Sequence, residues 1–328
     1  MNKLVIFSGT SNEPLAEKIA SNLSMKLGNI YHHNFPSGET YCQFQQNIRG
    51  SDVFLIQSIT CPANERLMQL LVMSDAARRA SANRITAVVP YFGYSRQDRK
   101  DKSRVPITAK LVLDLFEASG INRVVTMDLH SPQVGGFTNL PFDHLTFEPV
   151  LSNWIKNKYH SLALRDSVVL MAPDVGAVKR VEKYATMLGC DFGFISKKRI
   201  GDDRVELQSI TGDVSDKNVI IIDDLTESSG TLIQAANACK TNGATKVICA
   251  VTHGCFTQTG MSRLNTVMPH PDITESPVID EFIYSNSSDV EWFYSYKPTS
   301  LIQLDVSSLF AKAISSIHND ESVSELFY

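Results

Sequence analysis

The sequence predicts an α/β protein made of two domains, each with a mostly parallel sheet flanked by helices. Short apolar runs alternate with helix-like segments along the chain, which is the pattern of parallel strands joined by crossover helices. Each half of the chain shows this alternation, and 328 residues suffice for two domains of ordinary size. We expect domains at 1–149 and 150–305, and a terminal helix and tail at 306–328 that can pack on the first domain.

The expected elements follow from these runs in chain order. In the first half, the strand-like runs are 4–7, 53–57, 85–89 and 124–127, and the helix-like runs are 13–27, 64–82 and 107–118. In the second half, the strand-like runs are 168–171, 191–195, 219–222, 247–251 and 281–284, and the helix-like runs are 176–188, 232–241 and 306–317. Residues 266–300, with several prolines and a Ser-Asn-Ser-Ser cluster, are expected to form a loop broken by short strands.

The composition limits the classes of function. A formal charge of −4 gives no support for nucleic acid as a general partner, and no apolar run approaches membrane-spanning length. The first residues lack the layout of a signal peptide. The six cysteines form no CxxC pair, which is typical of free thiols in a reducing compartment. We therefore expect a cytoplasmic protein that binds neither nucleic acid nor membrane.

The stretch 219–232, VIIIDDLTESSGTL, carries the strongest signal for a site. A buried strand leads into two acids and then into a loop of hydroxyl residues and glycine. At the carboxyl end of a parallel strand, such a loop offers backbone N–H groups and a helix N-terminus to a phosphate. The acids can accept hydrogen bonds from sugar hydroxyls or hold Mg²⁺. A capping role is the simpler interpretation of any single residue, but the combination indicates a site for a phosphorylated sugar.

A second loop, at 91–106, reads YFGYSRQDRKDKSRVP and follows the expected strand at 85–89. An isolated loop with so many charged residues is most often a solvated turn. Here, however, an Arg-Gln-Asp group directly follows aromatic residues, and a guanidinium and an amide can hold phosphate groups and adenine edges. This loop therefore predicts a nucleotide site.

Both stretches resemble motifs of known proteins. The first is similar to the phosphoribosyl-diphosphate binding motif of the type I phosphoribosyltransferase fold, and YSRQDRKDKSR resembles the nucleotide-binding loop of ribose-phosphate diphosphokinases. The resemblance to the phosphate-activated diphosphokinases covers nearly the whole chain, through FSGTSNEPLAEKIA, FPSGET, MDLHSPQ, APDVGAVKR and IHNDESVSELF in family order. It implies two tandem type I phosphoribosyltransferase-like domains that transfer the β,γ-diphosphoryl group of Mg-ATP to ribose 5-phosphate and release AMP.

The resemblance also implies which residues bind the nucleotide and its metal. An ATP site would be lined by Phe35, Ser37, Glu39, Arg96, Gln97 and Asp98. His130 would meet the metal–triphosphate, and Asp174 is the matching acid for Mg²⁺ in the second half. Without the family match, Phe35 would be an ordinary core aromatic, His130 a satisfied polar residue, and Asp174 a turn or N-cap residue.

The remaining roles come from the same resemblance. Ribose 5-phosphate would be held by Asp223, Asp224, Glu227, Ser228, Ser229, Gly230 and Thr231. Lys197 and Arg199 match cations of a mobile catalytic loop and join His130 as catalytic residues, although loop cations are otherwise usually solvated surface. A subunit-interface site for phosphate or ADP would be formed by Arg49, Ser81, Arg104, Ser322 and Ser324. The implied assembly is a homodimer built into a hexamer, with inorganic phosphate as activator.

Some positions depart from the family pattern. Glu227 stands where Asp is usual, Ser228 replaces a usual Thr, and Ser37 sits where Asp or Asn is commoner. Two alternatives stay open: a catalytically silent regulatory paralogue of the same family, and a phosphoribosyltransferase that consumes the diphosphate sugar. The loop cations and the two acids argue against the first alternative, and the nucleotide loop at 91–106 argues against the second.

Overall fold

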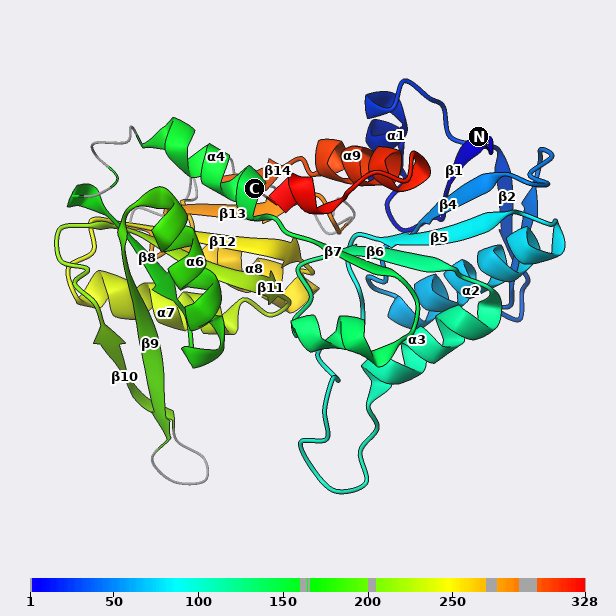
Figure 1. Ribbon diagram of the computed structural model, residues 1–328. Coiled ribbons are helices and arrows are strands. Elements are labelled where there is room, and N and C mark those ends of the chain that lie inside the picture. Colours follow the sequence, from blue (N-terminus) through cyan, green and yellow to red (C-terminus); the bar gives the residue numbers. More distant parts are fainter. Residues whose placement is uncertain are drawn as a thin grey trace. The chain divides into compact units, whose positions relative to one another are not determined.

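The structure, a computed structural model, describes residues 2–159, 164, 166–199, 205–269, 276–288 and 300–327 (Figure 1). Of residues 197–199, 205–208, 325 and 327 it describes the backbone but not the side chains. The chain divides into two compact units. The first comprises Met1–Thr146, Ser287–Asp289 and Asp305–Tyr328, and the second comprises Phe147–Asn286 and Val290–Leu304. The terminal segment is thus part of the first unit.

The first unit contains a five-stranded parallel sheet in the order β1-β4-β5-β6-β7. Its strands are β1 (Leu4–Ser8), β4 (Asp52–Ile56), β5 (Arg84–Val89), β6 (Arg123–Met127) and β7 (Phe142–Leu145). An antiparallel hairpin, β2 (Ile30–Asn34) with β3 (Thr40–Phe44), forms a separate two-stranded sheet. The central strand β4 is buried along its whole length because helices cover both faces of the sheet.

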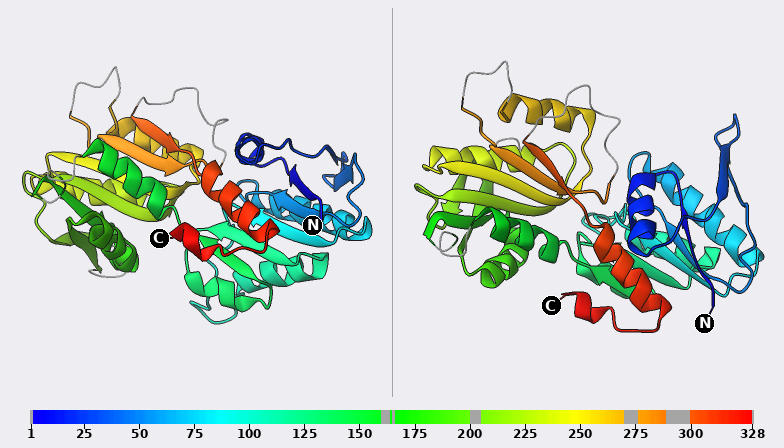
Figure 2. Two further views of the ribbon diagram at one scale, coloured as in Figure 1. Left: turned by 45° about the horizontal axis from the view of Figure 1, so that its top comes forward. Right: turned by 90° about the horizontal axis from the view of Figure 1, so that it is seen from above.

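Two pairs of helices enclose the sheet of the first unit (Figures 1 and 2). Helices α2 (Ala63–Arg79) and α3 (Thr108–Ser119) cover one face, and α1 (Glu13–Asn22) and α9 (Ser307–His318) cover the other. Two short 3₁₀ helices, η1 (Pro132–Phe137) and η4 (Ser324–Phe327), complete the unit. Helix α1 ends five residues before the predicted 13–27, because Ser24 adopts a left-handed backbone with φ of 55°.

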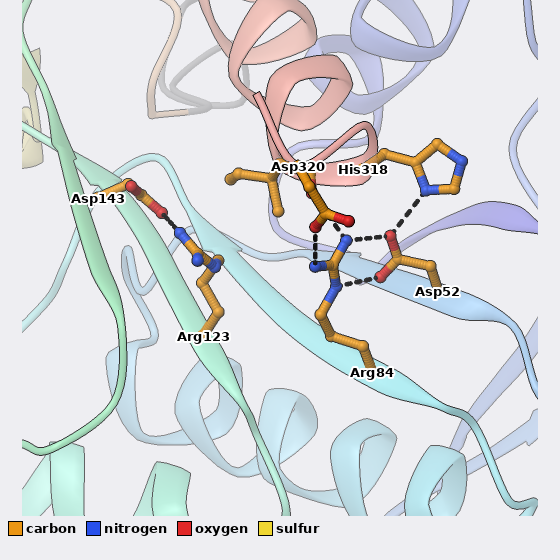
Figure 3. Close-up of polar contacts among 7 residues, drawn as sticks. Asp52, Arg84, Arg123, Asp143, His318 and Asp320 are labelled. Atoms are coloured by element: carbon orange, nitrogen blue, oxygen red, sulfur yellow. Dashed lines mark hydrogen bonds and ion pairs between the residues drawn. The ribbon is translucent and has the colours of Figure 1, made fainter. Parts of the chain in front are cut away.

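Helix α9 is tied to the amino ends of β4 and β5 by a partly buried charged cluster (Figure 3). Arg84 donates from Nε and Nη2 to the two carboxylate oxygens of Asp52, at 2.8 and 2.6 Å, and from Nη2 to the carbonyl of Ile317 at 2.8 Å. His318 Nδ1 lies 2.8 Å from Asp52 Oδ2, and Asp320 lies 3.5 Å from Arg84 Nη1. Asp52 is almost fully buried, and its carboxylate is paired with the guanidinium of Arg84 and contacts the imidazole of His318, two residues far apart in the sequence.

The described residues of the second unit form a seven-stranded sheet in the order β10-β9-β8-β11-β12-β13-β14, and of these strands only β10 runs antiparallel to its neighbour. Its strands are β8 (Val168–Ala172), β9 (Asp191–Arg199), β10 (Val205–Thr211), β11 (Asn218–Thr226), β12 (Lys246–Gly254), β13 (Glu281–Ser285) and β14 (Leu301–Leu304). The apolar run of β11 is fully buried between β8 and β12, as its composition predicts.

Helices again cover both faces of the sheet in the second unit (Figure 2). Helices α4 (Glu148–Lys158) and α6 (Val178–Leu188), with the short η2 (Val175–Ala177), lie on one face, and α7 (Gly230–Thr241) and α8 (Gln258–Val267) lie on the other. Pro149, near which the boundary was predicted, is in the first turn of α4, where proline is well tolerated. Within the described part of the chain, no helix has both the length and the apolar character needed to cross a bilayer.

Candidate active site

The loop that joins β11 to α7 lies at the carboxyl end of a parallel strand in the second unit. The prediction that the two acids follow the strand was wrong. Pairing with β12 continues through Asp223 and Leu225 as far as Thr226, so both acids belong to β11. Ser229 then takes a left-handed backbone, with φ of 59°, and α7 begins at Gly230. This sharp turn places the helix N-terminus directly after the strand.

The N-terminus of α7 can bind an anion. The first backbone N–H groups of a helix have no acceptor within the helix, and they carry the positive end of the helix dipole. The side chains of Glu227 and Ser228 are exposed beside this turn, whereas Ser229 is buried, with its hydroxyl 3.4 Å from Thr226 Oγ1. Thr231 lies in the first turn of α7 and is partly buried.

Helix α8 supports this loop from one side. Thr257 donates from its backbone N–H to the carbonyl of Glu227 at 3.0 Å and from its hydroxyl to the same carbonyl at 3.2 Å. Arg263 Nη1 donates to the carbonyl of Ser228 at 3.4 Å. Gly260 lies so close to the backbone of the loop that a Cβ at this position would be 2.1 Å from the carbonyl oxygen of Glu227. The backbone of the loop is therefore held by α8.

Asp223 and Asp224, here called the acid pair, lie beside Arg180 of α6. Arg180 Nη1 is 3.5 Å from Oδ1 of each carboxylate. Burial, together with the charge of Asp224, raises the pKa of Asp223 to about 8, and the positive charge of Arg180 opposes this rise. The three residues bring two acids and one cation together at the carboxyl end of β11. Carboxylates placed in this way can accept hydrogen bonds from sugar hydroxyls.

Asp174 follows β8 and caps the short helix η2. Its Oδ1 accepts hydrogen bonds from the N–H groups of Gly176, at 2.8 Å, and Ala177, at 3.3 Å. The capping role that the sequence left open is therefore present in the structure. Because an ionised carboxylate offers about four lone-pair sites, capping through Oδ1 is compatible with a further role as a metal ligand.

A polar cavity of about 580 Å³ in the first unit brings four of the expected nucleotide-binding residues together. It is lined by Arg96, Gln97, Asp98, Arg99, Asp101, Val105, Pro106, His130 and Ser131. Gln97 is also tied to the start of α3, because its carbonyl accepts the N–H of Ala109 and its side chain accepts the Thr108 hydroxyl. The cavity combines two arginines and one amide, which are side chains of the kind that bind phosphate groups, with two carboxylates.

The other three expected nucleotide-binding residues lie in the turn of the β2–β3 hairpin and do not line this cavity. Phe35 is 47% exposed and stacks edge-on with His33 and Tyr41, so it is not a core aromatic. Ser37 and Glu39 are exposed, and the Ser37 hydroxyl donates to Glu39 at 2.7 Å. Within one chain, these residues are therefore separate from the loop that carries Arg96.

Lys197 and Arg199 were expected on a loop, but their backbone belongs to β9 and pairs with Gln208 and Val205 of β10. Their side chains, and residues 200–204 that follow, are outside the part of the chain that the structure describes.

The five residues expected at an interface phosphate site come from three segments of the first unit. Arg49 and Ser81 lie at the amino ends of β4 and β5, where the N–H of Gly50 donates to the carbonyl of Ser81 at 2.8 Å. Arg104 lies in the loop that leaves the carboxyl end of β5. Ser322 and Ser324 follow α9 and are exposed.

The sequence reasoning missed two residues that contact β11 and the loop that follows it, Arg180 and Arg263. Arg180 is within the quoted motif APDVGAVKR, six residues after Asp174, but the motif does not reveal that α6 aims this side chain at β11. Nothing local marks Arg263, because its contact with Ser228 depends on how α8 packs against the loop.

Two family models match the chain. Residues 4–120 match the N-terminal domain of ribose phosphate pyrophosphokinase, and residues 198–328 match the phosphoribosyl synthetase-associated domain.

Similar proteins match over nearly their full length. The chain is 42% identical to a ribose-phosphate pyrophosphokinase of Chlorobaculum tepidum, with 98% of this chain and 94% of that protein covered. It is 40% identical to one of Aquifex aeolicus, with both chains fully covered. Its fold is similar to the crystal structure of phosphoribosylpyrophosphate synthetase from Mycobacterium smegmatis, with a TM-score of 0.87, 32% identity, and 97% and 100% of the two chains covered. These likenesses confirm the predicted α/β fold and the predicted family.

Proposed function

The chain belongs to the ribose-phosphate pyrophosphokinase family, and we propose that it binds ATP in its first unit and ribose 5-phosphate in its second. The enzyme transfers the β,γ-diphosphoryl group of ATP to the C1 hydroxyl of ribose 5-phosphate, which gives 5-phosphoribosyl 1-diphosphate and AMP. The observation that carries our assignment of the sugar site is the sharp turn from β11 into α7, because it puts a helix N-terminus directly after a strand that carries two acids near its carboxyl end. The 5-phosphate would lie on that N-terminus, with Ser228, Ser229, Gly230 and Thr231 around it.

The nucleotide would lie in the cavity lined by Arg96, Gln97, Asp98 and His130. Arginine binds phosphate oxygens through paired N–H donors, and an amide can bind the adenine edge. The exposed Phe35, with Ser37 and Glu39, would complete the site from a neighbouring subunit, because within one chain these three residues do not line the cavity.

Mg²⁺ is the metal that fits these residues. Among the described residues, no three or more His, Cys, Asp or Glu side chains are placed to hold a metal ion. Mg²⁺ usually takes one or two protein ligands together with substrate phosphates and water, so a complete protein cage is not required. His130 in the first unit and Asp174 in the second are each proposed as ligands of Mg²⁺, and the bound metal would supply charge neutralisation for the triphosphate.

The transfer needs positioning and charge neutralisation more than covalent help. The C1 oxygen of the sugar forms a bond to the β-phosphorus, the bond from that phosphorus to the α,β-bridging oxygen breaks, and AMP leaves with this oxygen. The hydroxyl proton is released, and we assign no side chain as its acceptor. Asp223, Asp224 and Glu227 orient the ribose hydroxyls, and Lys197 and Arg199 neutralise the charge that develops during transfer.

The enzyme would be cytoplasmic, would assemble from homodimers into a hexamer, and would be activated by inorganic phosphate. The six free cysteines support a reducing compartment. The separation of Arg49 and Ser81 from Arg104 along the first unit supports a phosphate site that is shared between subunits. Light scattering with and without phosphate would test the assembly.

One assay tests the function. Purified protein is incubated with Mg-ATP and ribose 5-phosphate, with and without inorganic phosphate, and AMP and 5-phosphoribosyl 1-diphosphate are quantified. We expect equal amounts of the two products, formed only when the sugar phosphate is present. The Asp224→Asn variant should bind ATP normally and release AMP much more slowly.

The same assay separates the alternatives. A protein that binds both substrates but forms no AMP would be a silent paralogue. A protein that consumes the diphosphate sugar with a nucleobase, and needs no ATP, would be a phosphoribosyltransferase. We favour the active enzyme because Lys197, Arg199, His130 and the acid pair are all present.

A further inference from the structure

We propose that Arg180 is a positioning residue for ribose 5-phosphate: its guanidinium holds the two carboxylates of the acid pair in place and offsets their charge. The inference rests on the proposed function, because it takes the acid pair as the site of the ribose hydroxyls. Arg180 contacts these acids and does not contact the reacting atoms.

The geometry places the Arg180 guanidinium against both acids. A single nitrogen, Nη1, lies 3.5 Å from Oδ1 of Asp223 and 3.5 Å from Oδ1 of Asp224. Oδ1 of Asp223 also accepts the backbone N–H of Asp224 at 2.9 Å. The carboxylate of Asp223 is therefore held by the backbone of Asp224, and both carboxylates contact one cation, so a change at Arg180 affects both of them.

The backbone position of Arg180 is fixed by the packing of α6. Its side chain leaves the first turn of α6, a helix that follows directly after the segment capped by Asp174. The same helix is anchored in the unit by the buried side chains of Val181, Tyr184 and Leu188. Because α6 cannot shift easily over the sheet, the guanidinium stays within reach of β11.

Charge explains why the acid pair requires such a partner. Asp224 is almost fully buried and Asp223 is mostly buried, so two negative charges side by side would be costly. The proposed ligand adds a phosphate that carries further negative charge. A cation at Arg180 lowers this repulsion and opposes the rise in the pKa of Asp223, so it increases the ionised fraction of the acid pair that can accept hydrogen bonds from the sugar. It should therefore affect the sugar phosphate and leave ATP almost untouched.

Three variants test the role: Arg180→Gln, Arg180→Lys, and the control Lys179→Gln, which removes a positive charge from the exposed neighbouring position. For each we would measure kcat, the KM for each substrate, and the Kd for ribose 5-phosphate alone by calorimetry. In Arg180→Gln, the KM and the Kd for the sugar phosphate should rise about tenfold or more, in the range reported for loss of a charged hydrogen-bond partner. The KM for ATP should change less than about twofold, kcat should fall less than kcat/KM for the sugar, and Arg180→Lys should recover part of the loss.

The outcomes separate this inference from the proposed function. If the wild-type protein binds no ribose 5-phosphate, the proposed function itself has failed. If the wild type binds it and Arg180→Gln binds it equally well, the positioning role is overturned. Equal damage to both substrates, or equal losses in Arg180→Gln and Lys179→Gln, would also overturn it. If Arg180→Gln does not fold, Arg180→Lys replaces it in the test. The positioning role would be overturned if Arg180→Lys bound ribose 5-phosphate as tightly as the wild type and Lys179→Gln.

Discussion

Replacing Gly260 with alanine should damage binding of the sugar phosphate, although residue 260 would not touch the ligand. The added Cβ would lie 2.1 Å from the carbonyl oxygen of Glu227, 3.1 Å from its carbonyl carbon and 3.2 Å from Cα of Ser228. All three are backbone atoms of the loop, so the clash cannot be relieved by the movement of a flexible side chain. Ordinary van der Waals contact begins at 3.4 Å, so α8 and the loop must separate by about 1.3 Å.

The size of the effect follows from that shift. A misplacement of about 1 Å can reduce turnover by about a hundredfold. We therefore expect kcat/KM for ribose 5-phosphate to fall between about tenfold and a hundredfold, while the KM for ATP stays within about twofold. Global stability should change less. Overpacking costs about 1–3 kcal/mol, but alanine in a helix gains about 1 kcal/mol over glycine, so the net loss should be about 2 kcal/mol or less.

Gly136→Ala is the matched control, because a Cβ at that position meets no atom within 4 Å. Steady-state kinetics for each substrate would be combined with urea unfolding of both variants. If Gly260→Ala keeps the wild-type kcat/KM for ribose 5-phosphate, the loop backbone held by α8 is not the phosphate site. If both variants lose activity equally, the effect is not specific to the contact with Glu227.

Three further predictions follow from other parts of the chain. Lys197→Ala should lower kcat by about a hundredfold or more with little change in the KM for ATP, since the cation acts on charge that develops in the transition state; comparable KM damage with kcat intact would refute that role. Burial raises the pKa of Asp223 in the folded protein to about 8, above its ordinary 3.8. Between these two pH values the folded protein keeps a proton that the unfolded chain has released. The ionisation of Asp223 therefore lowers the free energy of unfolding as pH rises from 3.8 to about 8. Asp223→Asn should therefore gain stability over the wild type between about pH 5 and pH 8, measured by urea unfolding, and a difference independent of pH would contradict this. Asp52→Asn should lower the free energy of unfolding by about 2 kcal/mol, since it weakens the pair with Arg84. Asp75→Asn, at an exposed pair with Arg79, should lower it by less than about 0.5 kcal/mol. Equal losses would show that the cluster around Asp52 contributes no more than a surface pair.

The buried parallel strands could be predicted from the sequence, because a run such as that of β11 is apolar on both faces. The edge strand β14 and the β2–β3 hairpin could not, since their partly exposed residues lack that signature. The end of β11 was also misplaced, because hydrogen bonding to β12 extends the strand through Asp223, a residue with low strand propensity.

The candidate sites divide in a similar way. Arg96, Gln97 and Asp98 are adjacent in sequence, so one loop motif was enough to group them, and the structure places them with His130 around one cavity. Arg180 could not be predicted, because its contact joins a helix to a strand more than forty residues farther along the chain. A local motif indicates candidate residues, but the tertiary structure shows which of their side chains are in contact.

The first unit is discontinuous in sequence, and this has a consequence for synthesis on the ribosome. The helix that covers one face of its sheet, α9, is translated last, and six of its apolar side chains, including Phe310 and Ile314, are buried. A nascent chain therefore completes most of the second unit before the first unit can close. A translation product that stops before residue 305 would leave an uncovered apolar face on the first unit. Limited proteolysis of such a product should cut the first unit faster than the second.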